Sequence, residues 1–434
     1  MADLSYVRTD MMPQQPAPLG QRGAVKWMRE NLFSGPFNTI LTLAGIYLIY
    51  AIIASITPWL LNGVWTANSL TECRQIIAAS AGEGASGACW AVIRERWHQW
   101  LFGFYPQDQY WRPTLAFALL FAAIAPVLFD RVPKQLLWFT MIYPALCFWL
   151  LWGGSIWGPI IAMLGFIVLG LVYRLTQPLI GIMPAAAAGF VAAVLWWLFL
   201  DVQIATTLAG IADVALKPVR STDFGGFLLA ITIGVTAISF SLPFGILLAL
   251  GRQSDMLIVK TLCVGFIEFI RGVPLITLLF TASLLLQYFL PPETKFDIIL
   301  RVIILVTLFA AAYLAEVIRG GLAALPRGQY EAADALGLDY WRAQRLIILP
   351  QALKISIPSI VSTFIGLFKD TTLVSFVGLL DPLRGVTNVV RADINWKGIY
   401  WEPNIYVGAI FFIICFSMSR YSMYLEGKLK TDHR

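Results

Sequence analysis

The sequence predicts an all-α polytopic membrane protein with about ten transmembrane helices. Of its 434 residues, 59% are hydrophobic and only 13% are charged, and the mean hydropathy is +0.74. A soluble domain carries about 25% charged residues. Many apolar runs here reach the length of about 20 residues that a helix needs to cross a bilayer. The net charge of +6 therefore reports membrane topology rather than contact with nucleic acid.

The apolar runs place the predicted spans in order along the chain. They cover residues 37–58, 113–129, 136–154, 159–173, 184–200, 225–250, 274–291, 298–317, 355–378 and 404–424. The third and fourth runs have an alternative interpretation as one broken or re-entrant unit, because three glycines and Pro159 interrupt them. Ten spans place both termini on the same side of the membrane.

Positive charge predicts that this side is the cytoplasm. Cytoplasmic loops carry an excess of Lys and Arg. The segments assigned to that side, with the adjoining Arg420, contain 19 of the 31 Lys and Arg residues, against 10 in the opposite segments. The cytoplasmic segments are 1–36, 130–135, 174–183, 251–273, 318–354 and 425–434, and the external ones are 59–112, 201–224, 292–297 and 379–403.

The N-terminal 36 residues are polar and contain several prolines but no early apolar run. This composition predicts a disordered cytoplasmic tail and gives no indication of a cleaved signal peptide. The chain then divides near residue 220. Residues 1–220 have few recognisable motifs, whereas residues 221–434 carry every motif that we find.

The external segment 59–112 contains Cys73 and Cys89. In an oxidising compartment these two residues would form a disulfide, and the alternative is two free thiols. Residues 94–112 mix Trp, Tyr and Arg, a composition typical of a helix that lies at the membrane interface. Ligand contact is the alternative for this stretch. His98 is interpreted as a surface residue, because no second His or Cys stands at ligand spacing.

A polar, helix-forming stretch, EAADALGLDYWRAQRLIILP, occupies residues 331–350 between long apolar runs. Gly337 can adopt the left-handed conformation that ends a helix. Asp339 is a plausible N-cap for a second short helix over about 339–347. Pro350 should then stop this helix before the next span. The pattern predicts a helix–turn–helix elbow that lies flat on the membrane.

The elbow fits the spacing E-A-A-x3-G-x9-I-x-L-P at Glu331, Ala332, Ala333, Gly337, Ile347, Leu349 and Pro350. It resembles the cytoplasmic loop by which the permease of an ATP-driven bacterial importer grips its ATPase. The alternative is an ordinary Ala-rich amphipathic helix ended by glycine. Residues 315–376, FIEFIRGVPL at 266–275 and the stretch 224–252 are also similar to permeases of the polar amino-acid uptake family of ATP-binding-cassette importers.

The resemblance implies a five-helix type I importer permease core at 221–426. It leaves 37–220 as an N-terminal membrane extension, with cytoplasmic tails at 1–36 and 427–434. The long extension is similar to that of the larger permeases for glutamate, glutamine, aspartate and asparagine, or for general L-amino acids. The resemblance further implies a bacterial inner-membrane location and an alternating-access importer.

The partners follow from the same resemblance. It implies two ATP-binding-cassette ATPase subunits, a periplasmic amino-acid-binding protein and a second, homologous permease in a heterodimer within the lipid bilayer. This chain would need no cofactor, since ATP is bound by the ATPase. In the elbow, Glu331 would pair with a basic residue of the ATPase, the small Ala332 and Ala333 would enter a narrow cleft, and Gly337 would serve as the hinge.

Two further groups are candidates for the gate and the path. Glu268 or Arg271 could pair with the elbow and stiffen the gate, and Gly272 and Pro274 would set the entry into the next helix. Snorkelling of Arg271 to the headgroups is the simpler interpretation. Glu316 has a local partner in Arg319. Ionisable residues inside a membrane are costly and are a functional hypothesis by default. A cluster rich in hydroxyl groups would line the translocation path. The alternative is a polar clamp between helices. The cluster consists of Lys369, Asp370, Thr371, Thr372 and Ser375.

Several motifs are absent from the sequence. No G-x-x-x-x-G-K-[ST] occurs, so this chain does not bind ATP through a P-loop. No H-E-x-x-H or paired-cysteine motif is present, and His98 and His433 cannot form one metal site. The sequence thus predicts a transport subunit rather than an enzyme. An ion-coupled secondary transporter is the alternative function, although inverted repeats are not evident.

Overall fold

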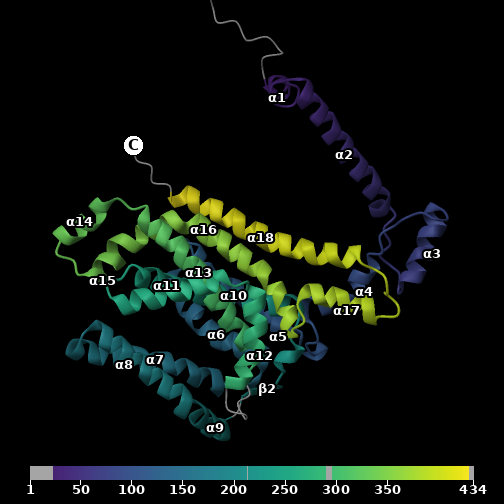
Figure 1. Cartoon of the computed structure of the whole chain (residues 1–434). Helices are drawn as coiled ribbons and strands as arrows, with labels where there is room; N and C mark the ends of the chain where they lie inside the picture. The colour runs from purple at the N-terminus through teal and green to yellow at the C-terminus, as the bar shows by residue number, and fades with distance from the viewer. Residues whose placement is uncertain (1–22, 213, 290–295, 430–434) are drawn as a thin grey trace, which may run out of the picture. The chain divides into compact units, whose positions relative to one another are not determined.

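The computed structural model describes residues 23–212, 214–289 and 296–429 (Figure 1). Within these residues, nine helices are long and apolar enough to cross a membrane, and a tenth results if one bent helix pair is a single span. The predicted all-α fold with about ten transmembrane helices is therefore confirmed. Most of the tail at 1–36, the end of the tail at 427–434, and His433 lie outside the described residues.

The chain forms two compact units, residues 1–91 and 92–434. The described helices of the first unit are α1 (Gly23–Asn31), α2 (Pro36–Leu61) and α3 (Leu70–Ala81). Helix α1 corrects the prediction that all of 1–36 is disordered. An i,i+4 pair between Lys26 and Glu30, 3.7 Å apart, and a bond from Asn31 to the carbonyl of Trp27 support this helix.

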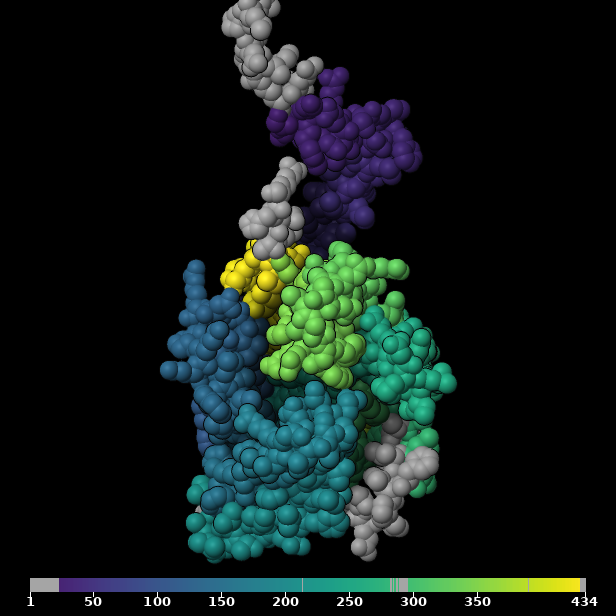
Figure 2. Space-filling model, turned by 90° about the vertical axis from the view of Figure 1, so that its left-hand side faces the viewer, coloured from purple at the N-terminus to yellow at the C-terminus, as the bar shows by residue number. Residues whose placement is uncertain are grey.

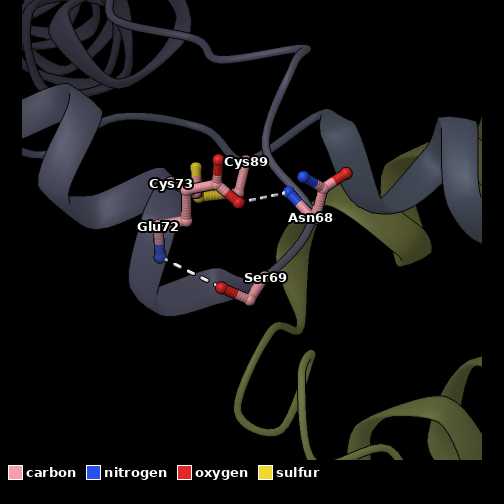
Figure 3. Close-up of a disulfide and its surroundings, with 5 residues drawn as sticks. All are labelled: Asn68, Ser69, Glu72, Cys73 and Cys89. Carbon is pink, nitrogen blue, oxygen red and sulfur yellow. Dashed lines mark hydrogen bonds between the residues drawn. A yellow bond between two sulfur atoms is a disulfide. The ribbon is translucent and has the colours of Figure 1, made fainter.

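The part of the first unit that the sequence predicts to be external is closed by a disulfide between Cys73 and Cys89, whose Cα atoms are 6.0 Å apart (Figure 3). The sequence left a disulfide and two free thiols as alternatives, and the structure contains the disulfide. The Ser69 side chain accepts a hydrogen bond of 3.1 Å from the backbone N–H of Glu72 and so caps α3. A backbone bridge between Val64 and Cys89 joins the segment that follows α2 to the disulfide.

The second unit begins with the elements of the extension. The α6–α7 region, for which the sequence allowed one broken unit, forms two separate spans. A turn at Gly153 (φ +74°) follows α6, and the antiparallel pair of short strands, with Gly154 opposite Leu216, joins the segment between α6 and α7 to the segment after α9. The elements are α4 (Ala91–Phe102), α5 (Trp111–Leu128), α6 (Leu137–Trp152), β1 (Gly154–Ser155), α7 (Trp157–Ile180), α8 (Ile182–Leu195), α9 (Asp201–Ile211) and β2 (Ala215–Leu216).

The interfacial helix predicted over 94–112 is not a single helix. Helix α4 ends at Phe102, and Gly103 follows with φ +69°. A 3-10 turn at Gln107–Gln109 then leads into α5, which contains Arg112. Gly103 breaks the predicted helix, because its positive φ is a backbone conformation that glycine adopts readily.

The remaining elements form the core of the second unit around α13, which packs along α10, α11, α12 and α16 (Figure 1). Small buried residues such as Ala311 and Gly245 allow α10 and α13 to approach closely, since a Cβ on Gly245 would lie 2.8 Å from Leu314. The elements are α10 (Gly226–Arg252), α11 (Leu257–Gly272), α12 (Leu275–Phe289), α13 (Ile298–Ala323), α14 (Arg327–Ala335), α15 (Tyr340–Ala343), α16 (Leu349–Asp370), α17 (Pro382–Ala392) and α18 (Trp401–Leu429).

The boundary at residue 220 is not a boundary between compact units, because residues 92–220 pack onto the core. The Trp152 indole donates a 2.8 Å hydrogen bond to Ser221, and the Ser221 hydroxyl bonds Asp297, the N-cap of α13. Gly226 begins α10 with φ +58°, and a Cβ there would lie 2.1 Å from the carbonyl oxygen of Trp100. Residues 92–220 of the extension and the core thus belong to one compact unit.

Arg112 is the buried anchor of this region, with 1% of its surface exposed. Its guanidinium donates to the carbonyl of Leu150, near the C-terminus of α6, to the carbonyl of Lys217, and to the side chain of Gln109. Carbonyls at a helix C-terminus lack intrahelical donors and attract a cation. Arg112 therefore fixes α5, α6 and the segment that leads into the core.

Candidate coupling site

Helix α14 ends at Ala335, and Gly337 provides the left-handed residue of its C-terminal cap, as the sequence predicts. The N–H of Leu338 donates to the carbonyl of Ala333 (3.2 Å), and the N–H of Gly337 donates to that of Asp334 (2.9 Å). These two bonds form a Schellman motif, which satisfies carbonyls that the helix end leaves free. Gly337 has φ +67° and open space around its Cα. Glycine is thus favoured at position 337 by the left-handed backbone conformation and not by a lack of space for a side chain.

The second helix of the elbow begins at Asp339, whose side chain accepts a 2.9 Å bond from the N–H of Arg342. Helix α15 then continues through a π-helical turn at Gln344–Ile348 into α16. The prediction that Pro350 stops this helix is wrong, because Pro350 lies in the first turn of α16. A proline cannot donate to the carbonyl four residues before it, and the wider π turn accommodates that missing bond.

The outward face of α14 carries Glu331 and Ala332, whereas Ala333 is buried with 1% exposed. The interpretation that both alanines enter a partner's cleft is therefore corrected: Ala333 packs within this chain. Neighbouring residues of an α-helix point in directions about 100° apart, so two adjacent alanines do not share a face. In Figure 2 the light-green surface of α14 and α15 faces the viewer without a covering segment.

Apolar contacts and hydrogen bonds from Gln351 hold the elbow to the core. Tyr330, Ile347 and Leu349 pack against a buried cluster that includes Ile267 and other residues of α10, α11, α13 and α16. The Gln351 amide of α16 donates to the Gln329 side chain of α14 at 2.8 Å. The motif residues Ile347 and Leu349 thus pack against the core and fix the elbow to it.

A charged cluster lies at the ends of α10, α11 and α13. Arg252 of α10 bonds Glu268 of α11 at 2.9 Å and also bonds Glu316 of α13. Glu316 further contacts Arg319 at 3.0 Å and Arg271 at 3.9 Å. The predicted Glu316–Arg319 pair is present. Glu268 and Arg271 have these partners in place of the elbow contacts proposed from the sequence, and Arg252 was not singled out by sequence reasoning.

Gly272 and Pro274 flank a break between α11 and α12. The two helices meet at a bend of 101° across Val273. Pro274 has no N–H to continue α11, and its carbonyl instead accepts the N–H of Thr277 at 3.0 Å, which starts α12. The straight span predicted at 274–291 is therefore the second arm of a bent pair, and its end at 290–291 lies outside the described residues.

The cluster from Lys369 to Ser375 lies where α16 passes into a 3-10 helix, Thr371–Val377. Lys369 is exposed, Asp370 is half-buried and Thr371 is buried. The hydroxyls of Thr371, Thr372 and Ser375 each donate to the backbone carbonyl three residues earlier, at 2.7–3.0 Å. These hydroxyls stabilise the local helix, and the two ionisable side chains remain for the path or a helix contact.

Two hollows lie on the predicted external side. One, of about 640 Å³, is lined by Arg96, Gln99 and Phe104 on one side and by residues 388 and 392–395 on the other. His98 lines the second, of about 360 Å³, where its ring lies 5.9 Å from that of Tyr110. His98 is thus half-buried among aromatic rings rather than a free surface residue.

Asp381 caps α17 on the same side. Its carboxylate accepts the N–H groups of Leu383 (3.0 Å) and Arg384 (3.2 Å), and only 1% of its surface is exposed. Burial raises the pKa of Asp381 to about 6, against the lowering effect of these two backbone hydrogen bonds. Among the residues that the structure describes, no group of three or more His, Cys, Asp or Glu is placed to hold a metal ion.

The membrane-spanning helices, together with the elbow that packs against them, are the features of a membrane transport subunit. Residues 241–429 match the family described as binding-protein-dependent transport system inner membrane component. The chain is 68% identical, over the full length of both chains, to the glutamate/glutamine/aspartate/asparagine transport system permease protein BztC of Rhodobacter capsulatus. It is 38% identical to the inner membrane amino-acid ABC transporter permease protein YhdY of Escherichia coli, covering 96% of each.

This chain therefore belongs to the permeases of ATP-binding-cassette amino-acid importers. The alternative of an ion-coupled secondary transporter is wrong. A shorter relative, the glutamate/aspartate import permease protein GltK of Escherichia coli O6:H1, is 32% identical over 47% of this chain and 91% of its own length. The larger and smaller members thus share one part of about 208 residues.

Proposed function

We propose that this chain forms one half of the translocation path of an amino-acid importer and couples it to separate ATPase subunits through α14 and α15. The elbow carries this proposal. It is open on its outer face, ended by the Gly337 Schellman motif and seated on α10, α11, α13 and α16. Glu331 and Ala332, which are exposed, are the residues that we assign to ATPase contact.

The substrates that we propose are glutamate, glutamine, aspartate and asparagine. Support comes from the full-length 68% identity to a relative whose name gives these four amino acids. Lys369 and Asp370 are the ionisable side chains that we place along the path. Both lie within a predicted span, where a charge is costly unless it meets a partner, water or substrate.

The assembly that we propose contains a second, homologous permease, two ATPase subunits that bind the ATP, and a periplasmic amino-acid-binding protein. The family description, a binding-protein-dependent inner membrane component, supports the last of these. Both termini would lie in the cytoplasm. The distribution of Lys and Arg along the sequence supports this orientation.

Reconstitution of the complete complex in liposomes tests the proposal. We expect uptake of the four labelled amino acids only with internal ATP and external binding protein. We also expect Glu331→Arg to lower the amount of ATPase that co-purifies with the chain, because it reverses the charge on the open face. Uptake that proceeds without ATP, or ATPase binding that ignores the elbow, would contradict the proposal.

A further inference from the structure

Glu316 is the meeting point of three arginines that come from three helices. Arg319 lies in the same helix, with its Nε 3.0 Å from the Glu316 carboxylate. Arg271 of α11 approaches to 3.9 Å, and Arg252 of α10 bonds the other carboxylate oxygen. The Glu316 side chain is only 16% exposed, less than any of the arginines around it. One carboxylate thus holds together the ends of α10, α11 and α13.

The second carboxylate of the cluster is peripheral. Glu268 bonds Arg252 at 2.9 Å, but its side chain is 54% exposed. A surface ion pair of this kind contributes little, because water screens it. Arg271 also lies over the ring of Tyr313, 5.7 Å from its centroid. Glu316 is therefore the shared partner of the three arginines, and its loss would take this carboxylate from Arg271 and Arg319 while Arg252 keeps the exposed Glu268.

The position of the cluster connects the elbow to the bend. Glu316 and Arg319 lie in the last third of α13, which ends at Ala323, and α14 begins at Arg327. Arg271 is the penultimate residue of α11, immediately before the 101° break to α12. A movement of α14 reaches α13 directly through the chain and reaches α11 through the Glu316 carboxylate. The buried apolar cluster, which contains Ile318 and Ile267, adds a second tie between the same helices.

We propose that Glu316 is a positioning residue for transport: it ties the α11 arm of the bent pair to the coupling segment, so that displacement of the elbow changes the angle between α11 and α12. The proposal rests on the proposed function, because it requires an ATPase that moves α14. The break at Val273–Pro274 supplies the hinge, and packed helices joined by ion pairs shift as discrete units rather than deform. Glu316 itself need not touch substrate.

The test compares Glu316→Gln with Glu268→Gln in the complete reconstituted complex. Both changes remove one negative charge from the same cluster, but only the first leaves the three arginines without a common partner. We expect Glu316→Gln to lower substrate uptake per ATP hydrolysed by about tenfold, because α11 then loses the charged contact through which it would follow α13, and the arginines lose their shared partner. Glu268→Gln should stay within about twofold of the unmodified complex, because the pair is exposed. Glu316→Asp should recover part of the coupling.

The ratio of uptake to ATP hydrolysis separates positioning from folding, since a purely structural defect would reduce the amount of assembled complex without changing this ratio. If the Glu316→Gln complex does not assemble, the Arg271→Gln complex is measured instead, because this change removes only the contacts of Arg271 between α11 and α13. An assembled Glu316→Gln or Arg271→Gln complex with a normal ratio overturns the inference. Absence of ATP-coupled uptake in the unmodified complex would instead refute the proposed function.

Discussion

Replacement of Gly337 by valine tests the elbow most directly. Gly337 has φ +67°, and its N–H closes the Schellman motif on Asp334. An L-residue in this left-handed region costs about 1–2 kcal/mol, and a β-branched one lies at the upper end. Apart from its neighbours along the chain, no atom lies within 4 Å of the site of a new Cβ, so steric overlap with the rest of the chain adds nothing. We therefore expect a cost of about 2 kcal/mol, or about thirtyfold in the population of the ordered elbow.

Two matched variants isolate this cause. Gly337→Asn should behave nearly as the unmodified chain, because asparagine tolerates the left-handed conformation. Gly328→Val places the same bulk on the same helix, α14, at a position with open space and no positive φ. The assay is co-purification with the ATPase together with ATP-driven uptake, with the amount of inserted protein as reference. Full coupling in Gly337→Val, or an equal loss in Gly328→Val, would refute the reasoning.

Three further predictions concern the external side. Cys73→Ala should destabilise the region around α3 by about 3 kcal/mol, given the 16-residue separation, and faster proteolysis there would show it. Arg112→Met should lower the free energy of unfolding by several kcal/mol, because buried carbonyls lose their hydrogen-bond donors. Arg220→Met is the control and should be neutral, because the Arg220 side chain is 82% exposed. Equal melting temperatures of the two variants would contradict this expectation. The folded-state pKa of Asp381, about 6, lies above its unfolded value, so its contribution is complete below about pH 4 and is lost as pH rises through 6. Unfolding of the unmodified chain should therefore depend on pH across this window more steeply than that of Asp381→Asn.

Local sequence patterns predicted much of the structure of the elbow. The conformation at Gly337 and the cap at Asp339 each depend on one residue and its immediate neighbours, so the sequence could predict both. The end of the second helix at Pro350 could not be predicted in this way. Whether a proline ends a helix or enters its first turn depends on the turn before it, and here a π turn at Gln344–Ile348 carries the helix through.

Long-range contacts account for what sequence reasoning missed. Arg252 stands 64 residues from Glu316 along the chain, and nothing in its local pattern marks it as a partner. Arg112 reads as an interfacial arginine among Trp and Tyr residues, yet it is buried under the end of α6. In both cases the partner is set by which helix ends meet, and sequence periodicity does not specify that.

The sequence by itself determined the membrane class, the family resemblance and the place and conformation of the elbow's turn, because hydropathy and backbone preference are properties of short segments. Only the tertiary structure decided that Ala333 faces inward, that α11 and α12 form a bent pair, and that Glu316 gathers three arginines. These features arise from the packing of helices remote in the chain. The elbow is locally encoded, whereas the network that connects it to the membrane helices exists only once those helices have assembled.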